Sequence, residues 1–292
     1  METRNYTIGF SNLSEEHPYA VTVRESLQHA VAEHPNLQLV VRDNAKDDDR
    51  AIANAQEFAA IPVDLAMIYH LGERVGPTIS SALLKKGIKI IAIDIPIPPW
   101  AIYYGVNNQL AGGMVGEALG NWINQHWNGQ VDKVLVLTES RVLDFVRQRL
   151  SSAVDKMVSV LGFTPHDIMY LDAGNDRLPS ADAVNNIMQR WNDVQRIAII
   201  GFNDETALGA LDAARALGRE SHVVVVGQGG NLAPIELSNP KSRLIASTAY
   251  FPESYGPRLV KLALQMLNNE KVAREQFNDH ICLARDNVLG VN

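Results

Sequence analysis

Short apolar runs alternate along this chain with longer segments of helical periodicity. The apolar runs predict strands at residues 6–10, 37–41, 65–68, 88–93, 133–137, 168–171, 197–200, 223–226 and 243–247. In the other segments apolar residues recur every three or four positions, which predicts helices at 21–33, 50–60, 75–86, 110–126, 142–161, 181–191, 205–217 and 253–267. The order is therefore βαβα, and the chain is predicted to be an α/β protein.

The strands of such a chain are expected to form parallel sheets covered by helices on both faces. Residues 88–93 and 223–226 are almost continuously apolar, as strands buried on both faces are. The rhythm breaks at the proline-rich stretch 95–107, with four units before it and about four after it. With a length of 292 residues, this break predicts two similar lobes and a crossing between them.

The composition and the absence of certain motifs argue against several classes of function. The formal net charge is -7 and no block of lysine and arginine stands out, so nucleic acid is not an expected partner. Cys282 is the only cysteine and the eight histidines lack ligand spacing, so no metal site is predicted. The glycines of residues 111–116 lie inside a helical segment and do not follow a strand, and phosphate-loop, serine-elbow and zinc-protease motifs are absent. We therefore predict no cofactor and no enzymatic activity.

Two features of the sequence concern its compartment. No run approaches the roughly 18 apolar residues of a membrane span. The first ten residues enter a strand at once and do not have the form of an export signal. This start fits a cytosolic protein, and it fits equally an exported protein whose leader has been removed.

Ligands of open α/β sheets bind beyond the carboxyl ends of the strands, so polar residues at those positions are the candidates. Asp94 follows residues 90–93, and its carboxylate could accept hydrogen bonds from two neighbouring hydroxyls of a polyol. The alternative is an aspartate that forms a turn before proline. Gln228 follows residues 223–226 in the same way.

Two further candidates lie at or near the start of predicted helices. Of the pair after residues 197–202, we assign Asp204 to the helix cap and Asn203, whose amide donates and accepts, to the ligand. Arg147 could reach a ring oxygen and a hydroxyl together. A solvated helix arginine is the alternative, and it applies at least as well to Arg149.

His17 and Tyr19 lie in the first loop. The tyrosine ring could stack on a sugar and the histidine could form a hydrogen bond. A structural role for this pair is equally compatible with the sequence.

With these residues identified, the chain resembles the periplasmic sugar-binding proteins of ABC transporters, of the ribose and galactose type. The resemblance covers nearly the whole length. The most specific motif is Asn-Asp-x-x-Ala-Leu-Gly-Ala at residues 203–210. The other matching segments are residues 8–10, 17–19, 91–94, 104–112, 224–227, 247–252 and 255–256.

The resemblance implies a type I periplasmic binding protein, with two Rossmann-like lobes joined by a three-crossing hinge. Residues 1–106 and 249–279 would form the N-terminal lobe, residues 107–248 and 280–292 would form the C-terminal lobe, and the ligand cleft would lie between them. The implied function is capture of a monosaccharide or polyol by hinge closure and its delivery to a membrane permease. A monomer in the periplasm, with its leader removed, is expected.

By position in the motifs, the resemblance places Asp94, Arg147 and Asn203 on sugar hydroxyls. It also implies roles for His17, for Tyr19 in stacking, and for Asn175 and Tyr250 at the cleft rim. With Gln228, the predicted ligand-binding residues are therefore His17, Tyr19, Asp94, Arg147, Asn175, Asn203, Gln228 and Tyr250.

The chain departs from the ribose type at two of these positions. Ile95 stands where that type has an arginine, and Gln228 stands where the family usually has an aspartate, so the identity of the sugar stays open. The alternative is the effector domain of a regulator of the lactose-repressor type, which shares the fold. Such regulators carry an N-terminal helix-turn-helix and a Gly-Phe-Asp segment, and this sequence has neither.

Overall fold

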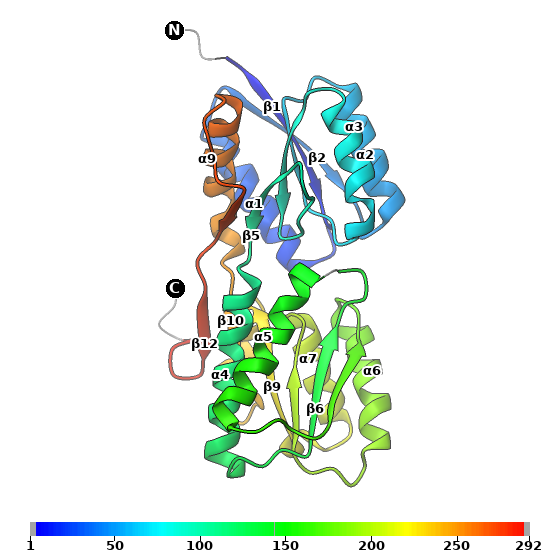
Figure 1. Ribbon diagram of the computed structural model, residues 1–292, viewed down its shortest axis with the longest axis vertical. Coiled ribbons are helices and arrows are strands. Elements are labelled where there is room, and N and C mark those ends of the chain that lie inside the picture. The colour runs from blue at the N-terminus through cyan, green and yellow to red at the C-terminus, as the bar shows by residue number, and fades with distance from the viewer. Residues whose placement is uncertain (1–3, 143, 289–292) are drawn as a thin grey trace. The chain divides into compact units, whose positions relative to one another are not determined.

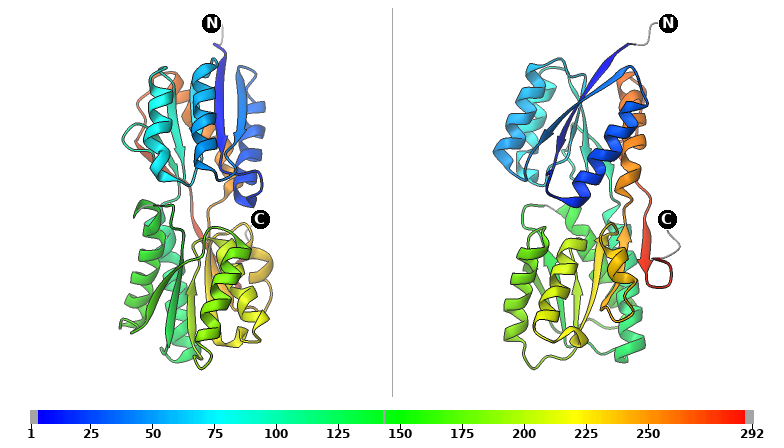
Figure 2. Two further views of the ribbon diagram at one scale, coloured as in Figure 1. Left: turned by 90° about the vertical axis from the view of Figure 1, so that its right-hand side faces the viewer. Right: turned by 180° about the vertical axis from the view of Figure 1, so that it is seen from behind.

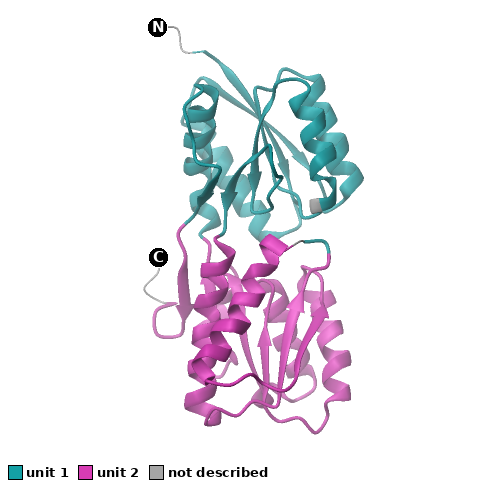
Figure 3. Ribbon diagram, viewed as in Figure 1, with its two compact units in different colours: residues 1–106, 141–143, 251–278 teal, residues 107–140, 144–250, 279–292 magenta. Residues whose placement is uncertain are grey.

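The computed structural model describes residues 4–142 and 144–288, which divide into two compact units (Figure 3). The first unit contains the described residues 4–106, 141–142 and 251–278. The second contains 107–140, 144–250 and 279–288. Apart from the short segment at 141–142, the chain passes between the units at 106–107, 250–251 and 278–279.

The first unit is built on a six-stranded parallel sheet of order β11-β5-β4-β3-β1-β2. Helices α1 and α9 pack together on one face, and α2 and α3 pack together on the other (Figures 1 and 2). The strands are β1 (Tyr6–Asn12), β2 (Leu37–Asp43), β3 (Leu65–Ile68), β4 (Lys89–Ile93), β5 (Ile102–Gly105) and β11 (Glu275–Phe277). The helices are α1 (Pro18–Ala32), α2 (Asp48–Ala60), α3 (Gly76–Leu84) and α9 (Tyr255–Leu267), with 3-10 turns at Glu73–Val75 and Pro252–Ser254.

The second unit has a six-stranded sheet of order β12-β10-β9-β8-β6-β7, parallel except for β12, which runs antiparallel to β10. Helices α4 and α5 pack together on one face, and α6 and α7 pack together on the other (Figure 1). The strands are β6 (Lys133–Thr138), β7 (Ile168–Asp172), β8 (Ile197–Ile200), β9 (Val223–Gly229), β10 (Leu244–Ala249) and β12 (Ile281–Ala284). The helices are α4 (Asn108–Trp127), α5 (Asp144–Leu161), α6 (Arg177–Arg190), α7 (Asp204–Ala216) and α8 (Ala233–Leu237), with a 3-10 turn at Glu220–His222.

The central strands are buried on both faces. Every residue of β3 and β8 is buried, so their side chains enter the core above and below the sheet. In the first unit, Gly9 of β1 lets the ring of Phe58 from α2 come so close that an added Cβ would lie 3.0 Å from it. This contact seats α2 on the sheet.

The contact of α4 with α5 depends on three glycines spaced four residues apart. Gly112, Gly116 and Gly120 lie on the face of α4 that meets α5. A Cβ at Gly112 would lie 2.0 Å from the carbonyl oxygen of Arg149, and one at Gly116 would lie 2.2 Å from that of Ala153. Any larger residue would push the helices apart, and at Gly112 it would displace the Arg149 backbone.

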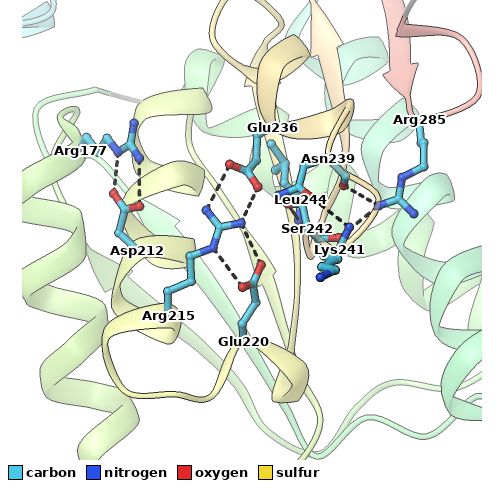
Figure 4. A network of polar contacts seen from close by, with 10 residues as sticks. All are labelled: Arg177, Asp212, Arg215, Glu220, Glu236, Asn239, Lys241, Ser242, Leu244 and Arg285. Carbon is cyan, nitrogen blue, oxygen red and sulfur yellow. Dashed lines mark hydrogen bonds and ion pairs between the residues drawn. The ribbon is translucent and has the colours of Figure 1, made fainter.

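An ion-pair network ties the end of α7 to its neighbours (Figure 4). The Arg215 guanidinium lies 2.9 Å from Glu220 and also pairs with Glu236 of α8. These hydrogen bonds raise the pKa of Arg215 and lower that of Glu236. Arg177, at the start of α6, makes a bidentate pair with Asp212 of α7. These ion pairs join α7 to α6, to α8 and to the 3-10 turn at Glu220–His222.

The predicted α/β architecture with mainly parallel sheets is confirmed. All nine predicted strands and all eight predicted helices are present, with ends shifted by a few residues; residue 143, inside the helix expected at 142–161, lies outside the described residues. Four elements were not predicted from the sequence: β5, which lies in the proline-rich break, β11, β12 and the five-residue α8.

Candidate functional site

A buried arginine organises the polar residues of the second unit. Arg149 is 6% exposed, and its Nε donates to Oδ1 of Asn108 at 2.8 Å. Its guanidinium lies 4.9 Å from the ring centre of Phe202 and 5.5 Å from that of Tyr250. Contacts with aromatic rings restrict the orientation of a guanidinium group, which suits recognition of hydroxyl and ring oxygens.

Gln228 connects this arginine to the end of β10. Its Nε2 donates to the carbonyl oxygen of Arg149 at 3.2 Å, and its Oε1 accepts the Tyr250 hydroxyl at 2.5 Å. The Gln228 side chain is fully buried, so both ends of its amide are used inside the protein. We call Asn108, Arg149, Gln228 and Tyr250 the Arg149 cluster. The cluster brings two of the predicted site residues together.

A second pair lies at the ends of β7 and β8. Asn203 donates from Nδ2 to Oδ1 of Asn175 at 2.6 Å and to its carbonyl oxygen at 3.1 Å. Both side chains are buried, with Asn203 8% exposed. The two predicted residues therefore form one amide pair at the carboxyl end of the sheet.

The assignment of the α7 cap to Asp204 is wrong. Asn203 is the N-cap, because its Oδ1 accepts the amide of Thr206 at 2.9 Å and the Thr206 hydroxyl completes a capping box. Asp204 is fully buried and accepts hydrogen bonds from Ser247 and from the amides of Leu232 and Ala233. Burial raises the pKa of the Asp204 carboxyl, while these donors oppose the rise. Its carboxylate therefore holds the backbone at the start of α8.

Arg147 lies outside the Arg149 cluster. Its side chain is 46% exposed, about 4.0 Å from Asp144 and 3.5 Å from the carbonyl oxygen of Ser140. The buried stripe of α5 contains Val146, Arg149, Leu150, Ala153 and Met157. This spacing of three and four was visible in the sequence and identifies Arg149 as the inward-facing arginine.

Two predicted residues of the first unit, Tyr19 and Asp94, contact Tyr255, which was not among the predicted site residues. Tyr255 donates from its hydroxyl to Oδ1 of Asp94 at 2.8 Å, and it is 3.0 Å from the Tyr19 hydroxyl. Tyr19 and Tyr104 approach the Tyr255 ring edge-on, at 6.2 and 5.1 Å between centroids. Asp94 has a left-handed backbone, with φ of 58°. The Tyr255 hydroxyl therefore holds the Asp94 carboxylate at the end of β4, and Tyr19 and Tyr104 pack against Tyr255.

Burial and the neighbouring Asp94 charge hold the pKa of Tyr255 well above its usual value. The phenol is a permanent donor to the carboxylate. His17, by contrast, is the N-cap residue of α1, where its side chain makes no capping hydrogen bond, and is 4% exposed.

Tyr255→Phe is expected to lower the free energy of unfolding by about 1–3 kcal/mol, because it leaves a buried carboxylate without one of its donors. Urea denaturation would measure the change. Tyr170→Phe is the control, since Tyr170 is 56% exposed on the edge strand β7 and should change stability by less than about 0.5 kcal/mol. Equal effects of the two changes would show that the Asp94 contact contributes nothing.

Two structural features are absent from the part of the chain that the structure describes. Among residues 4–142 and 144–288, no three histidine, cysteine, aspartate or glutamate side chains are grouped to hold a metal ion. No helix in the same part of the chain is both long and apolar enough to cross a membrane.

Comparison with known sequences identifies the family. The profile of the periplasmic binding protein domain matches residues 8–271. This chain belongs to the periplasmic binding protein family. The resemblance inferred from the sequence is thereby confirmed. Periplasmic binding proteins are non-enzymatic components of transport, which confirms the prediction of a binding protein over an enzyme.

Individual periplasmic binding proteins are similar over most of their length. The ribose import binding protein of Haemophilus influenzae is 27% identical over 91% of this chain and 87% of its own. The L-arabinose-binding periplasmic protein of Escherichia coli is 24% identical over 72% of this chain and 69% of its own.

Solved structures share the fold. A solute-binding protein from Bacillus halodurans with bound myo-inositol has a TM-score of 0.84 at 19% identity, covering 99% of this chain and 98% of its own. One from Mycobacterium smegmatis with bound glycerol has a TM-score of 0.86 at 17% identity, covering 98% of this chain and 96% of its own.

Proposed function

We propose that this protein captures a monosaccharide or a cyclic polyol and delivers it to the permease of an ABC transporter. The observation that carries the proposal is the Arg149 cluster, in which a buried guanidinium, side-chain amides and a phenol gather where parallel strands end. Such a set offers fixed donors and acceptors to neighbouring hydroxyls. The relatives named for ribose import and arabinose binding support a sugar ligand.

The first unit would supply a complementary set of ligand contacts. Asp94, held by Tyr255, would accept hydroxyl protons, and His17 and Tyr19 lie in the loop and helix that follow β1. We propose that both units contact one ligand and close on it, since a ligand favours a closed state only through higher affinity for that state. An unpaired hydroxyl buried by closure costs about 1–3 kcal/mol, which would discriminate between epimers.

We further propose that the protein acts as a monomer in the periplasm after removal of a leader, without a nucleic-acid partner. The relatives are import proteins, so the comparisons do not favour the effector domain of a lactose-repressor-type regulator. The Gln228 amide takes the position where the resemblance expects an aspartate, and its hydrogen bonds to Arg149 and Tyr250 give it a supporting part in the site.

A thermal-shift screen tests this function. Pentoses, hexoses, inositols and furanosides would each be added at saturating concentration. Binding at 100 times Kd contributes about 2.7 kcal/mol, so one structural class should raise Tm by several degrees. The sugar recovered afterwards should be unchanged by mass and NMR spectrum. A panel with no Tm shift, or chemical conversion of the sugar, would contradict the proposal.

A further inference from the structure

His280 lies next to one of the three passages of the chain between the units and contacts a residue at each of the other two. It lies two residues beyond the passage at 278–279. Its Nε2 accepts the backbone amide of Asn107, the first residue after the passage at 106–107, at 2.9 Å. Its ring lies 5.4 Å from that of Tyr250, the last residue before the passage at 250–251. One imidazole therefore connects segments that lie far apart in the sequence.

These contacts close a ring through the Arg149 cluster. Tyr250 donates to Gln228, and Gln228 donates to the Arg149 backbone. The Arg149 guanidinium donates to Asn108, the residue next to the His280 partner Asn107. Every link joins described residues of the second unit. A shift of the His280 imidazole would therefore displace Arg149 through two chains of contacts. One runs through Asn107 and Asn108, and the other runs through Tyr250 and Gln228.

We propose that His280 is a positioning residue, whose neutral imidazole fastens the three connecting segments to one another and thereby holds Arg149 in its ligand-binding orientation. The part that concerns ligand affinity rests on the proposed function. The structural part, which is that His280 fixes the positions of Asn107 and Arg149, does not depend on the proposed function.

The protonation state of the imidazole decides whether the link exists. Because Nε2 accepts an N–H group, the proton of the neutral ring is on Nδ1, which is buried. Protonation would place a second proton on Nε2 and remove the acceptor for Asn107. The link is therefore lost when His280 becomes charged.

The environment keeps His280 neutral. Burial, and then the Arg149 charge, lower its pKa to about 4, against the opposing effect of Asp279. The titratable and charged groups facing it are Arg149 on α5, the Tyr250 phenol after β10, and Asp279 beside it. An unfolded histidine titrates near 6.5, so the unfolded chain takes up the proton first. The His280 contribution to stability is complete above about pH 6.5 and is lost as the pH falls toward 4.

Two substitutions separate the acceptor from the ring. His280→Gln can place an amide oxygen where Nε2 accepts Asn107, without an ionisable group. His280→Phe keeps the ring against Tyr250 and removes the acceptor. NMR would follow exchange of the Asn107 amide and the Nε–H signal of Arg149 between pH 3.5 and 7. Calorimetry would measure binding of D-ribose, D-allose and myo-inositol.

In the wild type, we expect Asn107 protection and the Arg149 signal to change together with a midpoint near pH 4. His280→Gln should remain protected with no such midpoint, and His280→Phe should be unprotected throughout. A sugar that binds the wild type should bind His280→Phe about tenfold more weakly or worse, and His280→Gln within about threefold.

Unchanged Asn107 exchange and Arg149 signals in His280→Phe would overturn the inference, whether or not a sugar binds. If His280→Phe fails to fold, His280→Gln provides the test. A transition of the Asn107 exchange and the Arg149 signal near pH 4 that persists in His280→Gln would belong to another group and would overturn the inference. Absence of binding by the wild type to all three sugars counts against the proposed function, while the exchange data still decide the role of His280.

Discussion

Replacing Arg149 by alanine should weaken binding of any sugar that the wild type binds by about 100-fold or more. Hydrogen bonds to charged groups contribute about 1.5–3 kcal/mol each, and the guanidinium can offer a bidentate pair to neighbouring oxygens. Arg149→Lys should recover only part of the loss, because an ammonium group lacks the planar guanidinium fork that lies near the rings of Phe202 and Tyr250. Calorimetric titration well below Tm would measure both variants.

Arg147→Ala is the matched control for Arg149. It removes the same charge from the same helix two residues away, but from a side chain that is 46% exposed. Its affinity should stay within about threefold of the wild type. A strong loss in Arg147→Ala with normal binding by Arg149→Ala would show that Arg147 contacts the ligand, as predicted from the sequence, and that Arg149 does not.

Gly116→Ala should lower the free energy of unfolding by about 3 kcal/mol. The new methyl group would lie 2.2 Å from the carbonyl oxygen of Ala153, so α4 and α5 must separate to admit it. Chemical denaturation monitored by circular dichroism would measure the loss.

Gly113→Ala is the control for this prediction. Gly113 lies in the same helix, and a Cβ there would meet no atom within 4 Å. Alanine favours helix over glycine, so this variant should be more stable by about 0.5–1 kcal/mol. Two glycine substitutions of the same helix should therefore have effects of opposite sign. If Gly116→Ala is as stable as Gly113→Ala, the close contact of α4 and α5 does not exist.

The fold was largely predictable because buried parallel strands are continuously apolar and helices show their periodicity. β3 and β8 were placed at their observed bounds for this reason. The short strands were not predictable from local pattern. β5 follows a run of prolines, and β11 has three residues whose strand state depends on pairing with β5, some 170 residues earlier.

The candidate site was predictable to the extent that strand ends mark it. Asn203 and Gln228 were selected for their places at strand ends, and the structure shows that Asn203 is the helix cap. Arg149 could have been found from the periodicity of α5, which places it on the buried stripe. His280 could not, because its partner Asn107 lies 173 residues away and only the completed fold brings them together.

Small-angle X-ray scattering of the protein with and without a saturating sugar is the most direct test of ligand capture by closure. The sugar would be the one with the largest Tm shift in the screen. We predict a smaller radius of gyration on saturation for the wild type and no change for Arg149→Ala. Superimposable wild-type profiles, with calorimetry showing full occupancy, would contradict capture by closure of the two units.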